Sequence, residues 1–331
     1  MPLHNQESMK AENQLNMLPL TEIFNGTYRI ANKNIRMNEN GTSHITCELH
    51  DASGMKLGRC HPNAIKWYQS KPFQLVNVKG YLLHSDSEKW VNIISIEPNN
   101  DKACSNPLLR LPKALCADPA NLDSLIKIRD SIHSYALGKF LDTVFSDEEI
   151  AMAFIQVPAS RNYHHNHTGG LLAHSVEVAN IVANEKFYSN DECEIAIVAA
   201  LLHDIGKVKT FNTNRTYTKL GKMVGHDNLT LEVCSSALKE LDETWPDASY
   251  TMRHVWTCAS PGARYGFQPM CLIATSARNA DNQSCINFDI QKAYQSKLIK
   301  TGLLWTENQQ KYYWRPAAEP RQMKGLHNVQ H

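Results

Sequence analysis

The sequence predicts a small closed β-barrel followed by a larger all-helical domain. Between Ile23 and Pro98, short alternating apolar runs are separated by turn residues, which is the pattern of half-buried strands. After Pro107 the apolar period changes from two to roughly 3.6, which is the pattern of helices. The polar stretch NNDKACSN at 99–106 separates the two patterns, and a chain of 331 residues accommodates two domains of ordinary size.

Five candidate strands make up the predicted barrel. The turn sequences NENG, DASG and HSDSE lie between them, and the helix-like segment NAIKWYQ interrupts the series. An OB-like barrel is built in this way, and its strand face binds single-stranded nucleic acid through aromatic and basic side chains. The alternative for each aromatic residue is a place in the barrel core. The strands are expected at 26–37, 43–51, 55–61, 73–84 and 89–98, and the candidate face residues are Tyr28, Arg36, Lys56, Arg59, Trp67 and Trp90.

The second half of the chain reads as helices to about Leu303. Ser146 is expected to cap one of them, because acidic residues follow it in the first turn. A polar tail follows, with a Tyr/Trp cluster that is suited to docking on the body. The helices are expected at 120–145, 146–159, 169–187, 192–207, 226–243, 248–260 and 269–284. The predicted domains are a flexible N-terminus at 1–20, the barrel at 21–98, the helical domain at 107–304 and the tail at 305–331.

Composition narrows the class of protein. Lys and Arg total 34 against 33 Asp and Glu, which argues against a uniformly basic polyanion binder but permits a local basic groove. Nine cysteines without a CxxC pair argue against a disulfide framework or a cysteine zinc site, and fit reduced thiols. No signal peptide is recognisable, and no apolar run approaches the roughly 20 residues of a membrane span. The sequence therefore predicts a soluble, cytoplasmic protein.

Histidines and acids recur at helix positions in the helical half. In the segment EIAIVAALLHDIGK, an apolar run ends in His203 and Asp204, and a buried carboxylate needs either a structural partner or a cation. His174 is expected in mid-helix, His226 at a helix start and Asp281 at the end of the last long helix. Imidazole and carboxylate ligands together suit Mn²⁺, Fe²⁺, Zn²⁺ or Mg²⁺. These residues are candidates for a divalent metal site.

The order His174, His203-Asp204, Asp281 resembles the signature of the HD-domain metal-dependent phosphohydrolases. The segments PASRNYHHNHTGGLLAHSVEVA, ALLHDIGKVKTF and TYTKLGKMVGHDNL are similar to those of the bacterial OB-plus-HD 3′→5′ exoribonucleases. The barrel, with its NG…ITCELHDASG pattern, is similar as well. The resemblance covers roughly residues 22–290.

The resemblance implies roles for individual residues. One metal ion, with Mn²⁺ expected, would activate water and clamp phosphate oxygens during attack on a phosphodiester. In two-metal members Asp204 would bridge the ions and His226 would bind the second. Lys207 would neutralise charge on phosphate, and His164 or His165 would contact the substrate or protonate the leaving oxygen. The ligands of the first metal would be His174, His203, Asp204 and Asp281.

One departure from the family concerns the second metal. The family places an SHHG-like histidine pair a few residues after the position of His254, where this chain has Ala259 and Ser260. The second metal site then lacks a usual ligand unless His254 takes its place. Three consequences stay open: an enzyme with one metal ion, a different substrate, or a protein that binds its ligand without cleaving it. The same loop adds Arg264 and Tyr265 as candidate phosphate and base contacts.

Three functions follow in order of preference. The first is a 3′→5′ exonuclease acting on single-stranded RNA or DNA, in which the barrel captures the strand. The second is a nucleic-acid-binding or DNA-processing protein with a degenerate site, because a related HD domain occurs in MobH-class conjugative relaxases. The third is a phosphohydrolase of small nucleotides. The choice between RNA and DNA stays open, and a homo-oligomer is compatible with the sequence.

Overall fold

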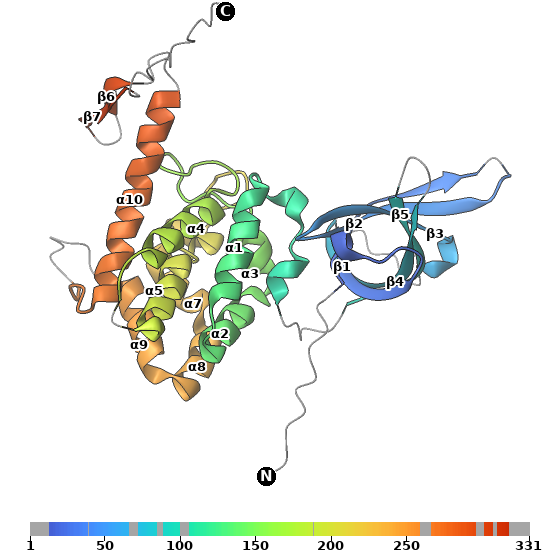
Figure 1. Ribbon diagram of the computed structural model, residues 1–331, viewed down its shortest axis with the longest axis horizontal. Coiled ribbons are helices and arrows are strands. Elements are labelled where there is room, and N and C mark those ends of the chain that lie inside the picture. The colour runs from blue at the N-terminus through green and yellow to red at the C-terminus, as the bar shows by residue number, and fades with distance from the viewer. Residues whose placement is uncertain are drawn as a thin grey trace, which may run out of the picture. The chain divides into compact units, whose positions relative to one another are not determined.

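The computed structural model describes a chain of two compact units, residues 1–281 and residues 282–331 (Figure 1). The first unit holds a barrel and a helical region, and the second holds the end of the last helix and a short hairpin. The described residues are 13–38, 40–65, 72–84, 89–99, 106–187, 189–258, 266–295, 301–306 and 310–317.

Five strands close the barrel in the order β1-β2-β3-β5-β4. The strand β1 is long enough to pair with β4 through its first half and with β2 through its second half, which closes the sheet on itself. Only β3 and β5 are parallel neighbours. The predicted OB-like barrel is therefore confirmed, with strands β1 (Ile23–Met37), β2 (Ser43–Asp51), β3 (Gly54–Cys60), β4 (Gln74–His84) and β5 (Lys89–Pro98).

The barrel interior is a separate apolar core. Alternate residues of each strand point inward, and the large side chains Leu49, Val76 and Val91 are completely buried. Tyr28 is also buried, and its hydroxyl donates to the carbonyl oxygen of Asn13 at 2.5 Å. Tyr28 is therefore a core aromatic, as the alternative reading of the sequence allowed. Of the predicted helix-like segment, Pro62–Ala64 forms a 3₁₀ turn, and residues 66–71 lie outside the described residues.

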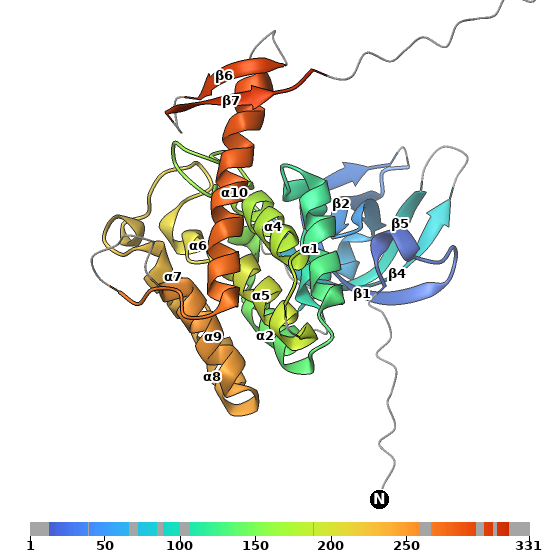
Figure 2. The same ribbon diagram turned by 60° about the vertical axis from the view of Figure 1, so that its left-hand side comes forward.

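The helical region is organised around α4 and α5, which lie side by side (Figure 2). Both are apolar on nearly every face, as expected of helices that are surrounded by others. The predicted helical region is confirmed. Its helices are α1 (Pro119–Ser131), α2 (Tyr135–Phe145), α3 (Glu148–Phe154), α4 (Gly170–Ala183), α5 (Asn190–Leu202), α6 (Lys207–Thr210), α7 (His226–Val233), α8 (Ser235–Thr244), α9 (Pro246–Thr257) and α10 (Leu272–Gln295), with 3₁₀ turns at Leu15–Met17, Pro107–Arg110, Lys113–Leu115 and Leu220–Lys222.

Several helix boundaries differ from the expectation. The predicted helix at 120–145 is broken between α1 and α2, where the Glu194 carboxylate accepts hydrogen bonds from the backbone N–H groups of His133 and Ser134. Asp147, rather than Ser146, caps α3, since its carboxylate accepts from the first free N–H groups. The helix predicted to end near Asp281 continues to Gln295 as α10. A distant partner, Glu194, accompanies the first of these differences, and a local side-chain cap decides the second.

The second unit contains a hairpin that the sequence analysis did not predict. Strands β6 (Gly302–Thr306) and β7 (Lys311–Arg315) pair in antiparallel register. The Tyr294 hydroxyl of α10 lies 2.8 Å from the carbonyl oxygen of Gly302 and 3.2 Å from that of Tyr313. The segment that reads as a polar tail is therefore ordered by contacts with the end of α10.

Two expectations from composition can be checked on the described residues. None of the described cysteines forms a disulfide, and burial raises the pKa of the Cys47 and Cys234 thiols to about 12. Buried thiols of this kind are unreactive. Within the described part of the chain, no helix has both the length and the apolar character needed to cross a membrane.

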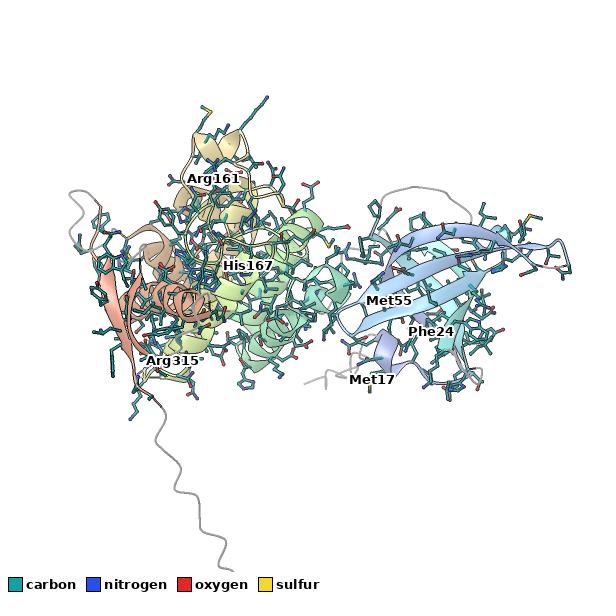
Figure 3. The ribbon with its side chains drawn as sticks, turned by 90° about the horizontal axis from the view of Figure 1, so that it is seen from above. Met17, Phe24, Met55, Arg161, His167 and Arg315 are labelled. Carbon is teal, nitrogen blue, oxygen red and sulfur yellow. The ribbon has the colours of Figure 1, made fainter. Side chains whose placement is uncertain are left out.

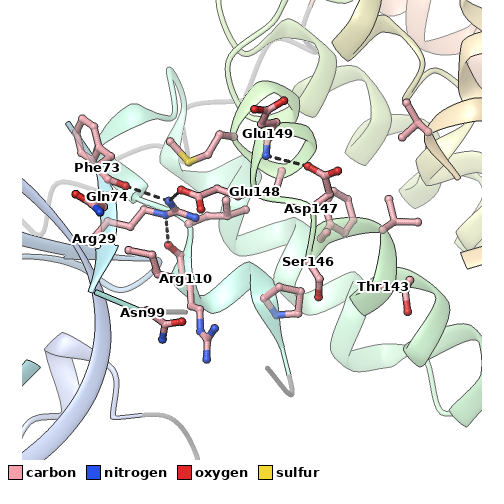
Figure 4. Close-up of a pocket in the computed structure, with 18 of the residues that line it drawn as sticks. Arg29, Phe73, Gln74, Asn99, Arg110, Thr143, Ser146, Asp147, Glu148 and Glu149 are labelled. Atoms are coloured by element: carbon pink, nitrogen blue, oxygen red, sulfur yellow. Dashed lines mark hydrogen bonds and ion pairs between the residues drawn. The ribbon is translucent and has the colours of Figure 1, made fainter. Parts of the chain in front are cut away.

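A buried arginine joins the barrel to the helical region. The Arg29 side chain is 4% exposed, and its Nε donates to the carbonyl oxygen of Arg110 at 2.8 Å. Its Nη1 donates to the carbonyl oxygen of Phe73 at 3.0 Å and to a carboxylate oxygen of Glu148 at 2.7 Å (Figure 4). A cavity of about 1010 Å³ lies beside this arginine. Four segments of the chain meet at one guanidinium group.

Replacing this arginine is expected to destabilise the whole first unit. Arg29→Met leaves two buried carbonyl oxygens without donors, which lowers the free energy of unfolding by about 2–4 kcal/mol. Glu148→Gln is the matched control and should cost less than about 1 kcal/mol, because Glu148 is more than half exposed. Urea unfolding followed by circular dichroism measures both. Equal costs would contradict the role of the backbone carbonyl groups.

Candidate metal centre

Four helices of the first unit deliver the predicted metal ligands. His174 lies in the second turn of α4, His203 is the C-cap of α5, and Asp204 follows it directly. His226 is the first residue of α7, and Asp281 lies in the middle of α10. Because Asp281 is not at a helix end, its neighbours on both sides are helical and hold its position.

The donor atoms converge on one point. The His174 Nε2 lies 3.1 Å from Asp281 Oδ1 and 3.5 Å from Asp204 Oδ2. The His203 Nε2 lies 3.3 Å from Asp204 Oδ2 and 3.8 Å from Asp281 Oδ1. Atoms that share one divalent ion at bonds of about 2.1 Å are about 3 Å apart. The spacing of the His174, His203 and Asp281 donor atoms therefore fits a single divalent cation, and Asp204 Oδ2 lies beside the two histidines.

The tautomer of His203 suits a metal ligand. A backbone carbonyl only accepts hydrogen bonds, so the contact of 2.7 Å between His203 Nδ1 and the Ala200 oxygen requires Nδ1 to carry the proton. Without a cation the neighbouring carboxylates keep Nε2 protonated as well. A bound metal ion would take the place of that proton and meet the Nε2 lone pair. This Nε2 is buried and makes no hydrogen bond to the described residues. Metal-bound histidines are commonly oriented by such a second hydrogen bond.

The charges of the site also call for a cation. Burial opposes ionisation of Asp204, but Lys207, His203 and His226 outweigh it and hold the pKa of Asp204 well below its ordinary value. Burial alone would lower the pKa of His203, yet Asp204 and Asp281 raise it to about 10. Both carboxylates are therefore ionised near neutral pH, and they draw positive charge to themselves. A divalent ion supplies that charge in a compact form.

Asp204 presents its two oxygens in different directions. Its Oδ2 faces the first cluster and lies 2.5 Å from Lys207 Nζ, whereas its Oδ1 lies 3.1 Å from His226 Nε2. His226 Nε2 is also 3.2 Å from a carboxylate oxygen of Asp227. A carboxylate with one oxygen on each side is suited to bridge two cations.

A glycine lets α7 reach the site. A Cβ on Gly206 would collide with the carbonyl oxygen of His226 and lie 2.5 Å from the backbone nitrogen of Thr230. In the absence of a Cβ, the Gly206 N–H donates to Thr230 Oγ1 at 3.0 Å, and this hydroxyl donates to the His203 carbonyl at 3.2 Å. The glycine in HDIGK is therefore needed for helix packing that places His226 beside Asp204.

A histidine-rich loop covers the other side of His174. The rings of His164 and His165 each lie 5.2 Å from the ring of His174. Burial, followed by the charges of His174 and Lys207, lowers the pKa of His164 to about 4, so its ring is neutral near pH 7. A neutral imidazole donates or accepts a hydrogen bond but is a poor general acid.

His165 is held in an unusual conformation. It has a φ of +47°, which is uncommon for a residue other than glycine, and its Nε2 lies 3.4 Å from a carboxylate oxygen of Glu177. A Cβ on Gly170 would collide with the His165 carbonyl oxygen, so the loop depends on that glycine. The sequence analysis did not select Glu177. Glu177 follows His174 by three residues on the same helix, and this spacing could have indicated that the two side chains lie on neighbouring positions of one helix face.

The remaining candidates lie elsewhere or outside the described residues. His254 Nε2 accepts a hydrogen bond from the Met270 backbone N–H at 2.9 Å, so the structure does not bring it into the cluster. On the barrel, Arg36 is exposed and Lys56 is half-buried. Their binding roles stay predictions. The candidates Trp67, Arg264 and Tyr265, and the departure at Ala259 and Ser260, lie outside the described residues.

Comparison with known proteins gives a family match and several relatives. The model of the HD domain family matches residues 171–257. The "3'-5' exoribonuclease YhaM" of Shouchella clausii is 25% identical over 67% of this chain and 70% of its own length. The protein of the same name from Bacillus subtilis is 31% identical over 61% of this chain and 65% of its own length. That from Oceanobacillus iheyensis is 26% identical, covering 66% and 70%.

The matches leave part of each protein uncovered. The chain covers 65% of the Bacillus subtilis protein and 64% of the protein of the same name from Halalkalibacterium halodurans, which is less than two thirds in each case. Among solved structures, the second OB-fold domain of replication protein A from Methanococcus maripaludis matches with a TM-score of 0.23 and 15% identity. That match covers 28% of this chain and 97% of the domain.

Metal addition is expected to stabilise the folded protein. Mn²⁺ at about 100 times its dissociation constant adds about 2.7 kcal/mol to the free energy of unfolding, which raises the melting temperature. Asp281→Asn should remove most of this response, whereas Asp191→Asn, an exposed acid at the start of α5, should keep it. Thermal unfolding with and without Mn²⁺ measures the effect. An undiminished response in Asp281→Asn would exclude Asp281 as a ligand.

A pair of glycine variants tests the packing of α7. Gly206→Ala forces this helix away from Asp204 and should cost about 1–3 kcal/mol of stability. Gly225→Ala is the matched control, since its Cβ would meet no atom within 4 Å and its φ is −64°. Chemical unfolding compares the two variants. Similar stabilities would show that α7 does not depend on the missing Cβ.

Proposed function

Because this chain is an HD-domain protein with an N-terminal barrel, distantly related to the bacterial YhaM 3′-5′ exoribonucleases, we propose that it is a metal-dependent phosphodiesterase. Its proposed reaction is the removal of nucleotides from the 3′ end of single-stranded RNA or DNA. The observation that carries this proposal is the convergence of His174, His203 and Asp281 on one point, with Asp204 beside the two histidines.

The proposed ligands of a divalent cation, with Mn²⁺ preferred, are these four residues. When bound, the ion supplies an activated water and neutralises charge on the phosphodiester. Asp204 also reaches His226, which we propose as the ligand of a second ion. The anchored ring of His203 keeps its lone pair directed at the ion without reorganisation.

We propose that three further side chains contact the phosphate. Lys207 is nearly buried against Asp204 and carries the positive charge closest to the proposed ion. His164 is neutral near pH 7, so its proposed role is a hydrogen bond to the substrate rather than proton donation. His165, fixed by Glu177, lies next to it and is proposed to act in the same way.

The outer surface of the barrel has a face that is suited to bind the single-stranded nucleic acid. The Arg59 guanidinium lies 4.8 Å from the centre of the Trp90 ring, so a cation and an aromatic surface are joined on neighbouring strands. Through the register, Arg59 faces outward with Thr46 and Asn34, and Arg36 follows on the same face of β1. Stacked aromatic and basic groups of this kind bind single-stranded nucleic acid. We propose this face as the site of strand capture.

A second candidate function is binding without cleavage. It is favoured by Ala259 and Ser260, which stand where the related enzymes are expected to have histidines. The geometry around Asp204 supports the enzyme, because Asp204 Oδ1 lies 3.1 Å from His226 Nε2, the spacing that two ligands of one proposed ion would have.

We propose the cytoplasm, a reducing compartment, as the location of the protein. The described cysteines form no disulfide, which is compatible with that compartment.

Digestion of an end-labelled oligonucleotide tests the proposal. A 5′-labelled strand of RNA or DNA should give a ladder of products shortened from the 3′ end with Mn²⁺ and no products with chelator. Asp204→Asn should reduce the rate at least 10³-fold, because the proposed ion loses a charged ligand. Asp191→Asn is the control and should cut normally. A strand that is bound but not cut by the wild type would favour the second candidate.

A further inference from the structure

The hairpin of the second unit exposes an aromatic face. In the register of β6 and β7, Leu303 pairs with Trp314 and Trp305 pairs with Tyr312, so these four side chains share one face. Their exposed fractions are 68%, 67%, 39% and 65% in that order. The opposite face holds the buried Leu304 and lies against Tyr294 of α10. A short hairpin that displays this much aromatic surface calls for an explanation.

The same unit is the basic part of the chain. Residues 282–331 contain seven Lys or Arg and three Asp or Glu, whereas the whole chain carries a net charge of only +1. The rest of the protein is therefore slightly acidic. Lys311 and Arg315 begin and end β7 on the face opposite these four side chains, where they lie over the rings of Tyr313 and Tyr294, and Figure 3 labels Arg315 at this end of the hairpin. The aromatic face thus lies on the element whose charge attracts a polyanion.

We propose that this face is a stacking platform for the bases of single-stranded nucleic acid, and that the net positive charge of the second unit attracts the phosphates. The inference rests on the proposed function and adds a binding site distant in sequence from the barrel. Side chains two residues apart on a strand are about 6.8 Å apart, twice the roughly 3.4 Å rise per nucleotide. Tyr312 and Trp314 therefore offer a ring each to every second base of a strand with this rise.

A second copy of the chain fits this face less well. The four side chains expose on the order of 400 Å², about half of what each partner buries in an ordinary specific interface. The excess of positive charge on the unit would also repel an identical unit. A strand of nucleic acid meets neither obstacle, because stacking needs only one ring per base and the phosphates are attracted.

Binding of a phosphorothioate oligonucleotide that resists cleavage tests the platform. Fluorescence anisotropy with the full-length protein and Mn²⁺ compares the wild type with Tyr312→Ala, Trp314→Ala and the double variant. Each single variant should weaken binding about fivefold or more, and the double variant about fiftyfold. Tyr250→Ala on α9, whose side chain is 62% exposed, is the matched control and should bind as the wild type. Circular dichroism checks that each variant is folded.

The outcomes separate this inference from the proposed function. Unchanged affinity in the double variant, with a wild type that cuts a cleavable strand, overturns the platform and leaves the nuclease intact. Weakened binding in the double variant, with a wild type that does not cut, supports the platform and overturns the nuclease. A wild type that binds no strand overturns both. A dimer in sedimentation that the double variant loses, with binding unchanged, assigns the face to self-association.

Discussion

The buried carboxylate of Asp204 is the constraint around which the first unit is arranged. It directly follows α5, whose C-terminal half is buried, and there an ionised group without partners would cost several kcal/mol. Its oxygens are met by His203 and Lys207 from its own HDIGK stretch and by His226 from the start of α7. Two features of the fold hold residues of this cluster in position. The helix α7 packs closely against the HDIGK turn, and α10 continues without a break through Asp281. The site is thus part of the core rather than an addition to its surface.

Much of this arrangement is readable from the sequence because it depends on local patterns. Alternating runs gave the five strands, two of them with correct ends at 43–51 and 89–98, and the period of 3.6 gave the helices. The order of the histidines and acids along the chain predicted the candidate ligands. Polar side chains at buried helix positions need partners, and a shared metal ion is one such partner. The selection of His174, His203 and Asp281 required no knowledge of distances, and the structure brings these three together.

Other features depend on contacts between distant segments and leave little trace in the sequence. The break between α1 and α2 is set by Glu194, about 60 residues further along the chain. The hairpin at 302–315 consists of two five-residue strands whose register is visible only once they pair on Tyr294. His254 was an ambiguous candidate because an imidazole on an apolar helix serves equally well as a hydrogen-bond acceptor, which is how Met270 uses it. The contact of Glu177 with His165 depends on the fold of the loop that carries His165, and the sequence does not show that fold.

The guanidinium of Arg29 also bears on how the protein acquires its structure. Its partners are contributed by residues 73, 110 and 148, so its last contact forms across 119 positions of the chain. Contacts of such sequence separation pay a large loop-closure entropy and form late. During synthesis the Phe73 and Arg110 carbonyl groups are available before Glu148 emerges, so the carboxylate is the last partner that Arg29 gains. The barrel and the helices consequently gain their final stability together, and loss of either is expected to loosen the other in a single cooperative transition.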